Sequence, residues 1–234
     1  MEMLTEQTTI RFRLNGIDVQ CPEGATILEV CRASGIPIPT LCNDKRLLPL
    51  GSCRLCIVEI RGYGMPVAAC STPAIEGMEV LTESDALTRL RRETLRLILA
   101  NHPNDCMCCE KAGRCTLQEL AYKFGMVPPA SAPRYDVLTM QEDNPGILID
   151  ANKCVRCGRC IAVCRDLVKR NAIVMRTPDG QDETRLMPEG RITLLNDRCD
   201  LCGECIKVCP VGTVLDKKQL GQRKSLVALQ SDPE

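Results

Sequence analysis

The only histidine of the chain lies at metal-ligand spacing from three cysteines, within residues 102–115. One imidazole nitrogen and three thiolates are a donor set that suits either zinc or an iron-sulfur cluster. Cys108 lies in the same loop and could replace Cys109, so the spacing alone leaves the choice of the third ligand open. The four expected ligands are His102, Cys106, Cys109 and Cys115.

A second group of cysteines precedes the histidine. Its gaps of ten, two and thirteen residues differ from the plant-type [2Fe-2S] spacing, which has only four residues in its first gap. Glycines at 51, 62 and 64 would let the backbone turn closely around whatever the thiolates hold. The members of this group are Cys42, Cys53, Cys56 and Cys70.

The last third of the chain repeats one cysteine motif. Gaps of two, two and three residues occur twice, and a proline, Pro210, follows the second copy, whereas Arg165 follows the first. This doubled pattern is the bacterial two-cluster ferredoxin signature, in which the fourth cysteine of each copy ligates the other cluster. Zinc sites more often use two separate Cys-x-x-Cys pairs. We expect one [4Fe-4S] cluster on Cys154, Cys157, Cys160 and Cys209, and a second on Cys199, Cys202, Cys205 and Cys164.

Composition favours metal over disulfides. The chain has 18 cysteines in 234 residues and no apolar N-terminal run of the kind that forms a secretion signal or a membrane span. We therefore expect a cytoplasmic protein without direct membrane insertion, whose thiols bind metal. Aromatic residues make up 2% of the chain and its net charge is zero, which counts against a nucleic-acid partner.

The first ligand group follows a predicted hairpin and helix. Apolar and polar residues alternate over 8–21 around Asn15-Gly16, the preferred type I′ turn. Thr26 and Glu29 form a capping box for a helix that Gly35 ends. Cys21 and Cys31 lie on the apolar faces of these elements, and we expect them to be buried thiols rather than ligands.

Further elements lead to the other ligands. Strands are expected at 57–60 and 67–69, so that Cys56 and Cys70 lie at strand ends. Ser84 caps a helix that stops near Asn101, because Pro103 disfavours helical geometry at His102. The expected apolar face of this helix is Leu87, Leu90, Leu97 and Ile98. Thr116 and Glu119 form another capping box, which starts a short helix through Phe124.

The ligand order over nearly the whole chain resembles a known family. It is similar to the N-terminal cluster region of the complex I large iron-sulfur subunit and of iron-only hydrogenase. It resembles more closely the small diaphorase subunit of NAD-reducing hydrogenases and NAD-linked formate dehydrogenases. In that family the first group carries a [2Fe-2S] cluster, and the histidine with its three cysteines carries a [4Fe-4S] cluster. The length of the chain fits the small-subunit version.

The resemblance implies an α+β chain of several small domains. We expect a [2Fe-2S] β-grasp domain at 1–82, a small helical domain with the histidine-containing cluster site at 83–128, a linker at 129–146, a two-[4Fe-4S] ferredoxin-like domain at 147–218 and a tail at 219–234. Apolar strand-like segments at 147–149 and 192–195 lead into the two repeated motifs, and a turn is expected around 177–180. The implied cofactors are one [2Fe-2S] and three [4Fe-4S] clusters.

The expected function is electron relay rather than catalysis. The chain shows no dinucleotide fingerprint, no phosphate loop and no catalytic residues. The family implies a flavin/NAD(P)-binding diaphorase subunit and a hydrogenase or formate dehydrogenase subunit as partners. The alternatives are a relay in another complex, such as an electron-bifurcating reductase, a zinc-rich structural module, or a self-sufficient enzyme. Basic residues within the motifs, among them Lys153, are either solvated charges or compensate reduced clusters.

Overall fold

The computed structural model describes residues 8–103, 105–126, 138, 140–187 and 189–220. Contacts divide the chain into two compact units. The first comprises the described residues of 1–100 and 120–128, and the second those of 101–119 and 129–234. Residues 101–119, which carry His102 and its three cysteines, therefore group with the repeated motifs. The finer domain boundaries expected from the sequence stay a prediction.

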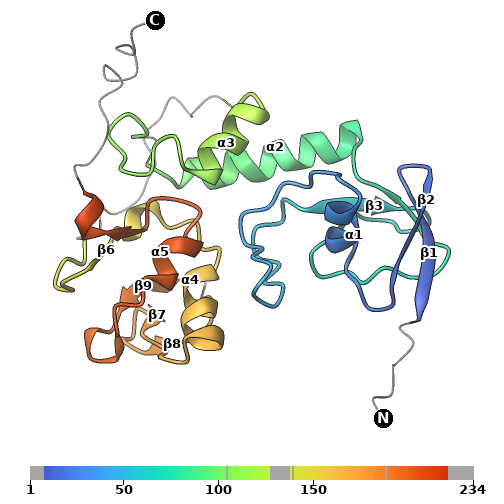
Figure 1. Ribbon diagram of the computed structural model, residues 1–234. Helices are drawn as coiled ribbons and strands as arrows, with labels where there is room; N and C mark the ends of the chain where they lie inside the picture. The colour runs from blue at the N-terminus through green and yellow to red at the C-terminus, as the bar shows by residue number, and fades with distance from the viewer. Residues whose placement is uncertain (1–7, 104, 127–137, 139, 188, 221–234) are drawn as a thin grey trace, which may run out of the picture. The chain divides into compact units, whose positions relative to one another are not determined.

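The first unit is built on a mixed sheet of five strands in the order β2-β1-β5-β3-β4 (Figure 1). Three of its pairings are antiparallel, whereas β1 runs parallel to β5, with Leu14 opposite Val80. The strands are β1 (Thr9–Leu14), β2 (Ile17–Pro22), β3 (Ile57–Ile60), β4 (Val67–Ala68) and β5 (Glu79–Leu81).

The predicted hairpin and helix are confirmed. Asn15 and Gly16 have φ of 52° and 83°, the left-handed values that a type I′ turn requires. Helix α1 (Ile27–Ala33) begins with the capping box: the Thr26 side chain accepts from the backbone of Glu29, whose carboxylate accepts from the backbone of Thr26. Strand β1 alternates exposed and buried residues, and its buried side packs in one core with α1. Cys21 and Cys31 lie in that core, 6% and 0% exposed, as expected of structural thiols.

Helix α2 (Asp85–Ala100) begins and ends where the sequence predicted, but its buried face differs. The Ser84 hydroxyl accepts from the backbone of Leu87 at 3.1 Å. The predicted apolar face was wrong for Leu90 and Leu97, which are 44% and 58% exposed. The buried residues instead lie four positions apart along the helix, and a charged residue, Arg91, occupies one of these core positions. The row is Leu87, Arg91, Leu95 and Leu99.

The second unit contains two small sheets and short helices (Figure 1). One sheet pairs β6 with β10, and the other has the order β8-β7-β9. Its elements are α3 (Thr116–Lys123, whose residues from 120 onward group with the first unit), β6 (Ile147–Ile149), η1 (Ala151–Lys153), α4 (Arg159–Ala162), the π-helical turn η2 (Val163–Leu167), β7 (Ile173–Arg176), β8 (Asp182–Glu183), β9 (Arg191–Leu194), η3 (Asn196–Arg198), α5 (Glu204–Val208), β10 (Val214–Asp216) and η4 (Lys217–Gln219).

The sequence repeat is also a structural repeat. Each copy runs strand, 3-10 turn, cysteine loop, helix and strand, which gives β6 to β7 in the first copy and β9 to β10 in the second. The strands pair between copies: β6 with β10 and β9 with β7. Helices α4 and α5 contact each other. Because the two copies share both sheets, the motifs fold as one body.

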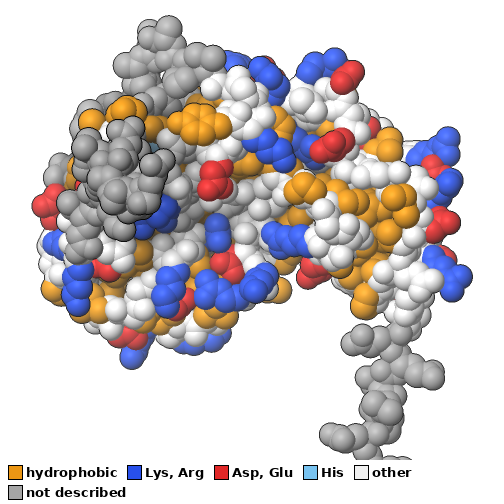
Figure 2. Space-filling view, turned by 45° about the horizontal axis from the view of Figure 1, so that its top comes forward, with side chains coloured by type: hydrophobic (Ala, Val, Ile, Leu, Met, Phe, Trp, Pro, Cys, Tyr) orange, Lys and Arg blue, Asp and Glu red, His pale blue; other side chains and the backbone are white. Residues whose placement is uncertain are grey.

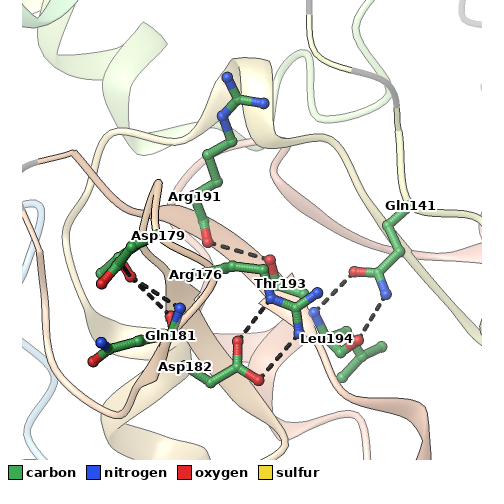
Figure 3. Close-up of polar contacts among 9 residues, drawn as sticks. Gln141, Arg176, Asp179, Gln181, Asp182, Arg191, Thr193 and Leu194 are labelled. Carbon is green, nitrogen blue, oxygen red and sulfur yellow. Dashed lines mark hydrogen bonds and ion pairs between the residues drawn. The ribbon is translucent and has the colours of Figure 1, made fainter.

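Side chains fix the edges of these small sheets (Figure 3). The Gln141 amide donates to the Leu194 carbonyl at 2.7 Å and accepts from the Leu194 N–H at 2.8 Å, which extends β9 as a neighbouring strand would. Arg176 forms two hydrogen bonds with Asp182 across β7 and β8, at 2.8 and 3.1 Å. The predicted turn at 177–180 joins these two strands, with the Gly180 N–H bonded to the Thr177 carbonyl.

The described surface carries charges of both signs. Lys and Arg side chains are interspersed with Asp and Glu side chains on the face that Figure 2 shows. This distribution agrees with the formal net charge of zero. Ion pairs among the described residues include Arg61 with the half-buried Glu79, and the exposed pair of Arg96 with Glu93. Exposed pairs of this kind contribute little to stability.

Candidate metal centres

The four cysteines of the first predicted ligand group lie close together around the start of β3 and the end of β4. Cys42, Cys56 and Cys70 are each 1% exposed, and Cys53 is half-buried. The sulfurs of Cys42 and Cys53 lie 3.3 Å apart, and the backbone N–H groups of Leu41 and Cys53 point at them from 3.4 Å. N–H groups aimed at sulfur stabilise a thiolate, which is the form that binds metal.

The four thiols pair in a way that favours one thiolate in each pair. The hydrogen bond with Cys53 lowers the pKa of Cys42 to about 5, and the hydrogen bond with Cys56 lowers the pKa of Cys70 to about 7. The same bonds, together with burial, raise the pKa of Cys53 and of Cys56. A bound cation would remove the remaining two protons, because metal ligation requires thiolates.

The histidine has the state that a metal ligand requires. His102 is 7% exposed, and its Nε2 is buried with no hydrogen-bond partner in the part of the chain that the structure describes. Burial lowers its pKa, so the imidazole is neutral and keeps a lone pair. A buried polar atom without a partner is costly, and a metal bond would satisfy it. Cys109 is buried and Cys108 is exposed, which favours Cys109 in the ligand set.

Cys115 lies at the start of α3. The helix begins at Thr116, so Thr116 is its first residue and not the cap that the sequence predicted. Burial raises the pKa of Cys115, but the N–H groups of Leu117 and Gln118 donate to its sulfur and act against this rise. The positive end of the helix thus faces the position of a thiolate.

The repeated motifs line two cavities, and each cavity gathers four cysteines. In both, three cysteines come from one repeat and the fourth from the other, which is the crossed grouping that the spacing predicted. The sets are Cys199, Cys202, Cys205 and Cys164 in the first, and Cys154, Cys157, Cys160 and Cys209 in the second.

The two cysteine loops have the same backbone conformation. Arg156 and Leu201, at equivalent positions, have φ of 51° and 59°, and the glycines two residues later, Gly158 and Gly203, have φ of 79° and 72°. Left-handed geometry is costly for residues other than glycine. These turns direct backbone N–H groups at the sulfurs, for example that of Arg159 at Cys157. Sequence spacing does not reveal the strained positions, although Gly-after-Cys in both motifs was a visible signal.

Burial makes some thiols of these cavities resist deprotonation unless a cation is bound. Burial raises the pKa of Cys154 to about 11 and that of Cys205 to about 12. Among the described residues, no three His, Cys, Asp or Glu side chains lie close enough together to hold a single metal ion. Assignment of the individual ligands therefore rests on the cavities, the burial and the spacing.

Lys153 precedes the first ligand of the repeat and is itself buried, with 11% of its side chain exposed. Burial lowers its pKa, but the hydrogen bond and charge of Asp150, 3.0 Å away, outweigh that effect, and the net pKa is raised. The ammonium therefore stays charged.

Three family models match the chain in succession. They describe a 2Fe-2S iron-sulfur cluster binding domain at residues 7–85, the iron-sulfur binding region of NADH-ubiquinone oxidoreductase-G at 91–128, and a 4Fe-4S dicluster domain at 153–213. The chain is thus an iron-sulfur protein with 2Fe-2S and 4Fe-4S binding domains, and its α+β class is as predicted.

Comparison with a solved structure identifies the family of the chain. It is 32% identical to a chain in the crystal structure of an NAD+-reducing [NiFe]-hydrogenase in the H2-reduced state, with a TM-score of 0.77 over 89% of this chain and 87% of that one. The chain therefore belongs to the family of iron-sulfur subunits that contains this hydrogenase chain and the NADH-quinone oxidoreductase G subunits.

Two curated relatives are much longer than this chain. The NADPH-Fe(3+) oxidoreductase subunit alpha of Geobacter sulfurreducens is 34% identical over 89% of the chain and 24% of its own length. The NADP-reducing hydrogenase subunit HndD of Solidesulfovibrio fructosivorans is 33% identical over 94% of the chain and 37% of its own length. The chain thus spans from about a quarter to somewhat more than a third of the length of these relatives. Within its described part, no helix is long and apolar enough to cross a membrane.

Proposed function

We propose that this chain is an electron-relay subunit of a multisubunit oxidoreductase. It would carry single electrons between a flavin/NAD(P)-binding diaphorase subunit and a separate hydrogenase-type or formate dehydrogenase-type subunit. The observation that supports this most directly is the pair of cavities, each lined by four cysteines from both repeats. Relatives named as NAD+- or NADP-reducing hydrogenases support the class of partner.

Four ligand groups would hold the relay cofactors. Cys42, Cys53, Cys56 and Cys70 would hold a [2Fe-2S] cluster. His102, Cys106, Cys109 and Cys115 would hold a [4Fe-4S] cluster, and each repeat cavity one more. Three features fit this role: the His102 Nε2, which has no hydrogen-bond partner among the described residues, the buried thiols, and the N–H groups that face sulfur.

When bound, such clusters accept and release one electron at a time. The chain itself would bind them, orient their ligands with backbone N–H groups and keep water from the buried sulfurs. The substrate chemistry at either end would belong to cofactors in the partner subunits.

Reconstitution with a diaphorase subunit tests the proposal. Anaerobic protein should be brown, and NAD(P)H should reduce its clusters only when the diaphorase subunit is present. Dithionite should reduce the chain alone without turnover of hydrogen or formate. Turnover by the chain alone would indicate a self-sufficient enzyme, and a colourless protein with stoichiometric zinc would contradict the relay.

The partner class is a second question, since a bifurcating or other low-potential reductase would use the same relay. Purifying the native complex and identifying its subunits by mass spectrometry decides it. Co-purification of a hydrogenase or formate dehydrogenase subunit would support the proposed partner class. Co-purification of a different catalytic subunit would contradict it and identify the actual partner.

A further inference from the structure

Lys153 is a buried cation between two of the proposed ligand groups. Its Nζ lies 3.0 Å from an Asp150 carboxylate oxygen and 3.8 Å from one of Asp105. The Asp150 side chain is 4% exposed, whereas that of Asp105 is 45% exposed. Asp105 directly precedes Cys106, and Lys153 directly precedes Cys154. One ion-pair network thus joins the loop of the His102 ligand group to the loop of the first repeat.

Close packing at Gly212 joins the same two loops. A side-chain carbon added at Gly212 would lie 3.1 Å from the Cys109 sulfur and 3.2 Å from Cδ of Lys153. The sulfur of one ligand group and the stem of Lys153 therefore both pack against the Gly212 backbone. In addition, the N–H of Thr116 bonds to the carbonyl of Pro210, next to Cys209. Lys153 is therefore held in place beside both groups.

The charge of Lys153 acts in a low-dielectric setting. Exposed charges are screened by water and salt, whereas a buried charge acts strongly on its neighbours. Asp150 offsets part of this charge, and the half-exposed Asp105 offsets less. Asp150 is itself held by the backbone N–H and side-chain amide of Asn152. If Lys153 were neutral, a buried carboxylate without a cation would remain beside the two groups.

We propose that Lys153 is a positioning residue for electron transfer that raises the reduction potentials of two neighbouring clusters, those of the His102 group and of the Cys154 group. This inference rests on the proposed function. On reduction each of these clusters would take one electron, from dithionite in vitro or from the diaphorase partner, and no bond or proton changes place. The added negative charge is stabilised by the fixed ammonium, so these two clusters accept electrons more readily.

The test is an anaerobic redox titration of the full chain, followed by EPR of each cluster. Lys153→Met and Lys153→Gln remove the charge, and Lys153→Arg keeps it. Lys207→Gln is the matched control: Lys207 also lies within two residues of ligands and pairs with Glu204 at 2.6 Å, but its side chain is 64% exposed.

Both neutral variants should lower the midpoint potentials of the His102 and Cys154 clusters and leave that of the [2Fe-2S] cluster unchanged. Lys153→Arg should retain wild-type potentials, and Lys207→Gln should shift them less. Unchanged midpoints, or an equal shift in all clusters, would overturn the inference. Loss of these clusters in both neutral variants would also overturn it, by showing that Lys153 serves assembly. The proposed relay fails separately, if wild-type protein itself shows no iron-sulfur signals.

Discussion

Replacing Arg91 with alanine should destabilise the [2Fe-2S] unit selectively. The Arg91 side chain is buried, and its guanidinium donates to the carbonyls of Ile57 and Thr82 at 2.7 and 2.9 Å. These bonds attach α2 to the sheet at Ile57, the residue after Cys56, and at Thr82, the residue after β5. Without Arg91, the part-buried Ile57 carbonyl and the buried Thr82 carbonyl both lose a hydrogen bond from a charged donor.

The expected magnitude follows from those two bonds. A hydrogen bond to a charged group contributes about 1.5–3 kcal/mol, and the cost of burying the guanidinium offsets part of it. We therefore expect Arg91→Ala to lower the free energy of unfolding of this unit by about 3 kcal/mol. With a urea dependence of about 2 kcal/mol per M for a unit of this size, the midpoint should fall by about 1.5 M.

The assay is anaerobic urea titration, with visible circular dichroism to follow the [2Fe-2S] cluster. Arg89→Ala, an exposed arginine on the same helix, is the control and should change stability by less than about 0.5 kcal/mol. Both bonds come from one nitrogen, Nη2. Arg91→Lys should therefore lie between wild type and alanine, because an ammonium can donate to both carbonyls but the lysine side chain is one atom shorter and differs in geometry. A shift for Arg91→Ala no larger than that for Arg89→Ala would refute the reasoning.

Three further changes test the ligand groups. His102→Cys should keep a cluster but lower its midpoint potential, because a thiolate adds negative charge where the imidazole is neutral. An unchanged midpoint potential in a redox titration would show that the neutral ligand does not raise the potential. Cys164→Ser should remove or alter the cluster of the second repeat, as read by EPR and iron content, and spare that of its own repeat; the reverse pattern would disprove the crossed ligation. Gly212→Ala should lower the free energy of unfolding of the second unit by about 1–3 kcal/mol through overpacking against Cys109, whereas Gly64→Ala, which meets nothing within 4 Å, should leave that of its own unit, the first, unchanged; equal losses in the two variants, each measured by denaturation of the affected unit, would contradict the close packing.

Local signals in the sequence predicted the first unit well. The Asn15-Gly16 turn and the Thr26 and Glu29 capping box act over a few residues, so they do not depend on the rest of the fold. The end of α2 was also predictable, because Pro103 imposes it locally. The face of α2 was not, since burial of Arg91 depends on two carbonyls that lie outside the helix. A row of leucines alone could not reveal a charged residue in the core.

The cysteine groups were predictable for a different reason. Cluster ligation fixes the spacing of ligands, so the doubled motif implied the crossed sets that line the two cavities. Spacing carries no information on packing between groups. The position of Lys153 beside Asp105 and the approach of Cys109 to Gly212 depend on tertiary contacts between residues about 50 to 100 apart.

Metal and sulfide analysis of the anaerobically purified chain, with EPR during dithionite reduction, tests the central claim most directly. One [2Fe-2S] and three [4Fe-4S] clusters predict about 14 iron and about 14 sulfide per chain, with signals of both cluster types on reduction. Stoichiometric zinc in a colourless protein, or iron sufficient for only the two repeat clusters, would contradict a four-cluster relay.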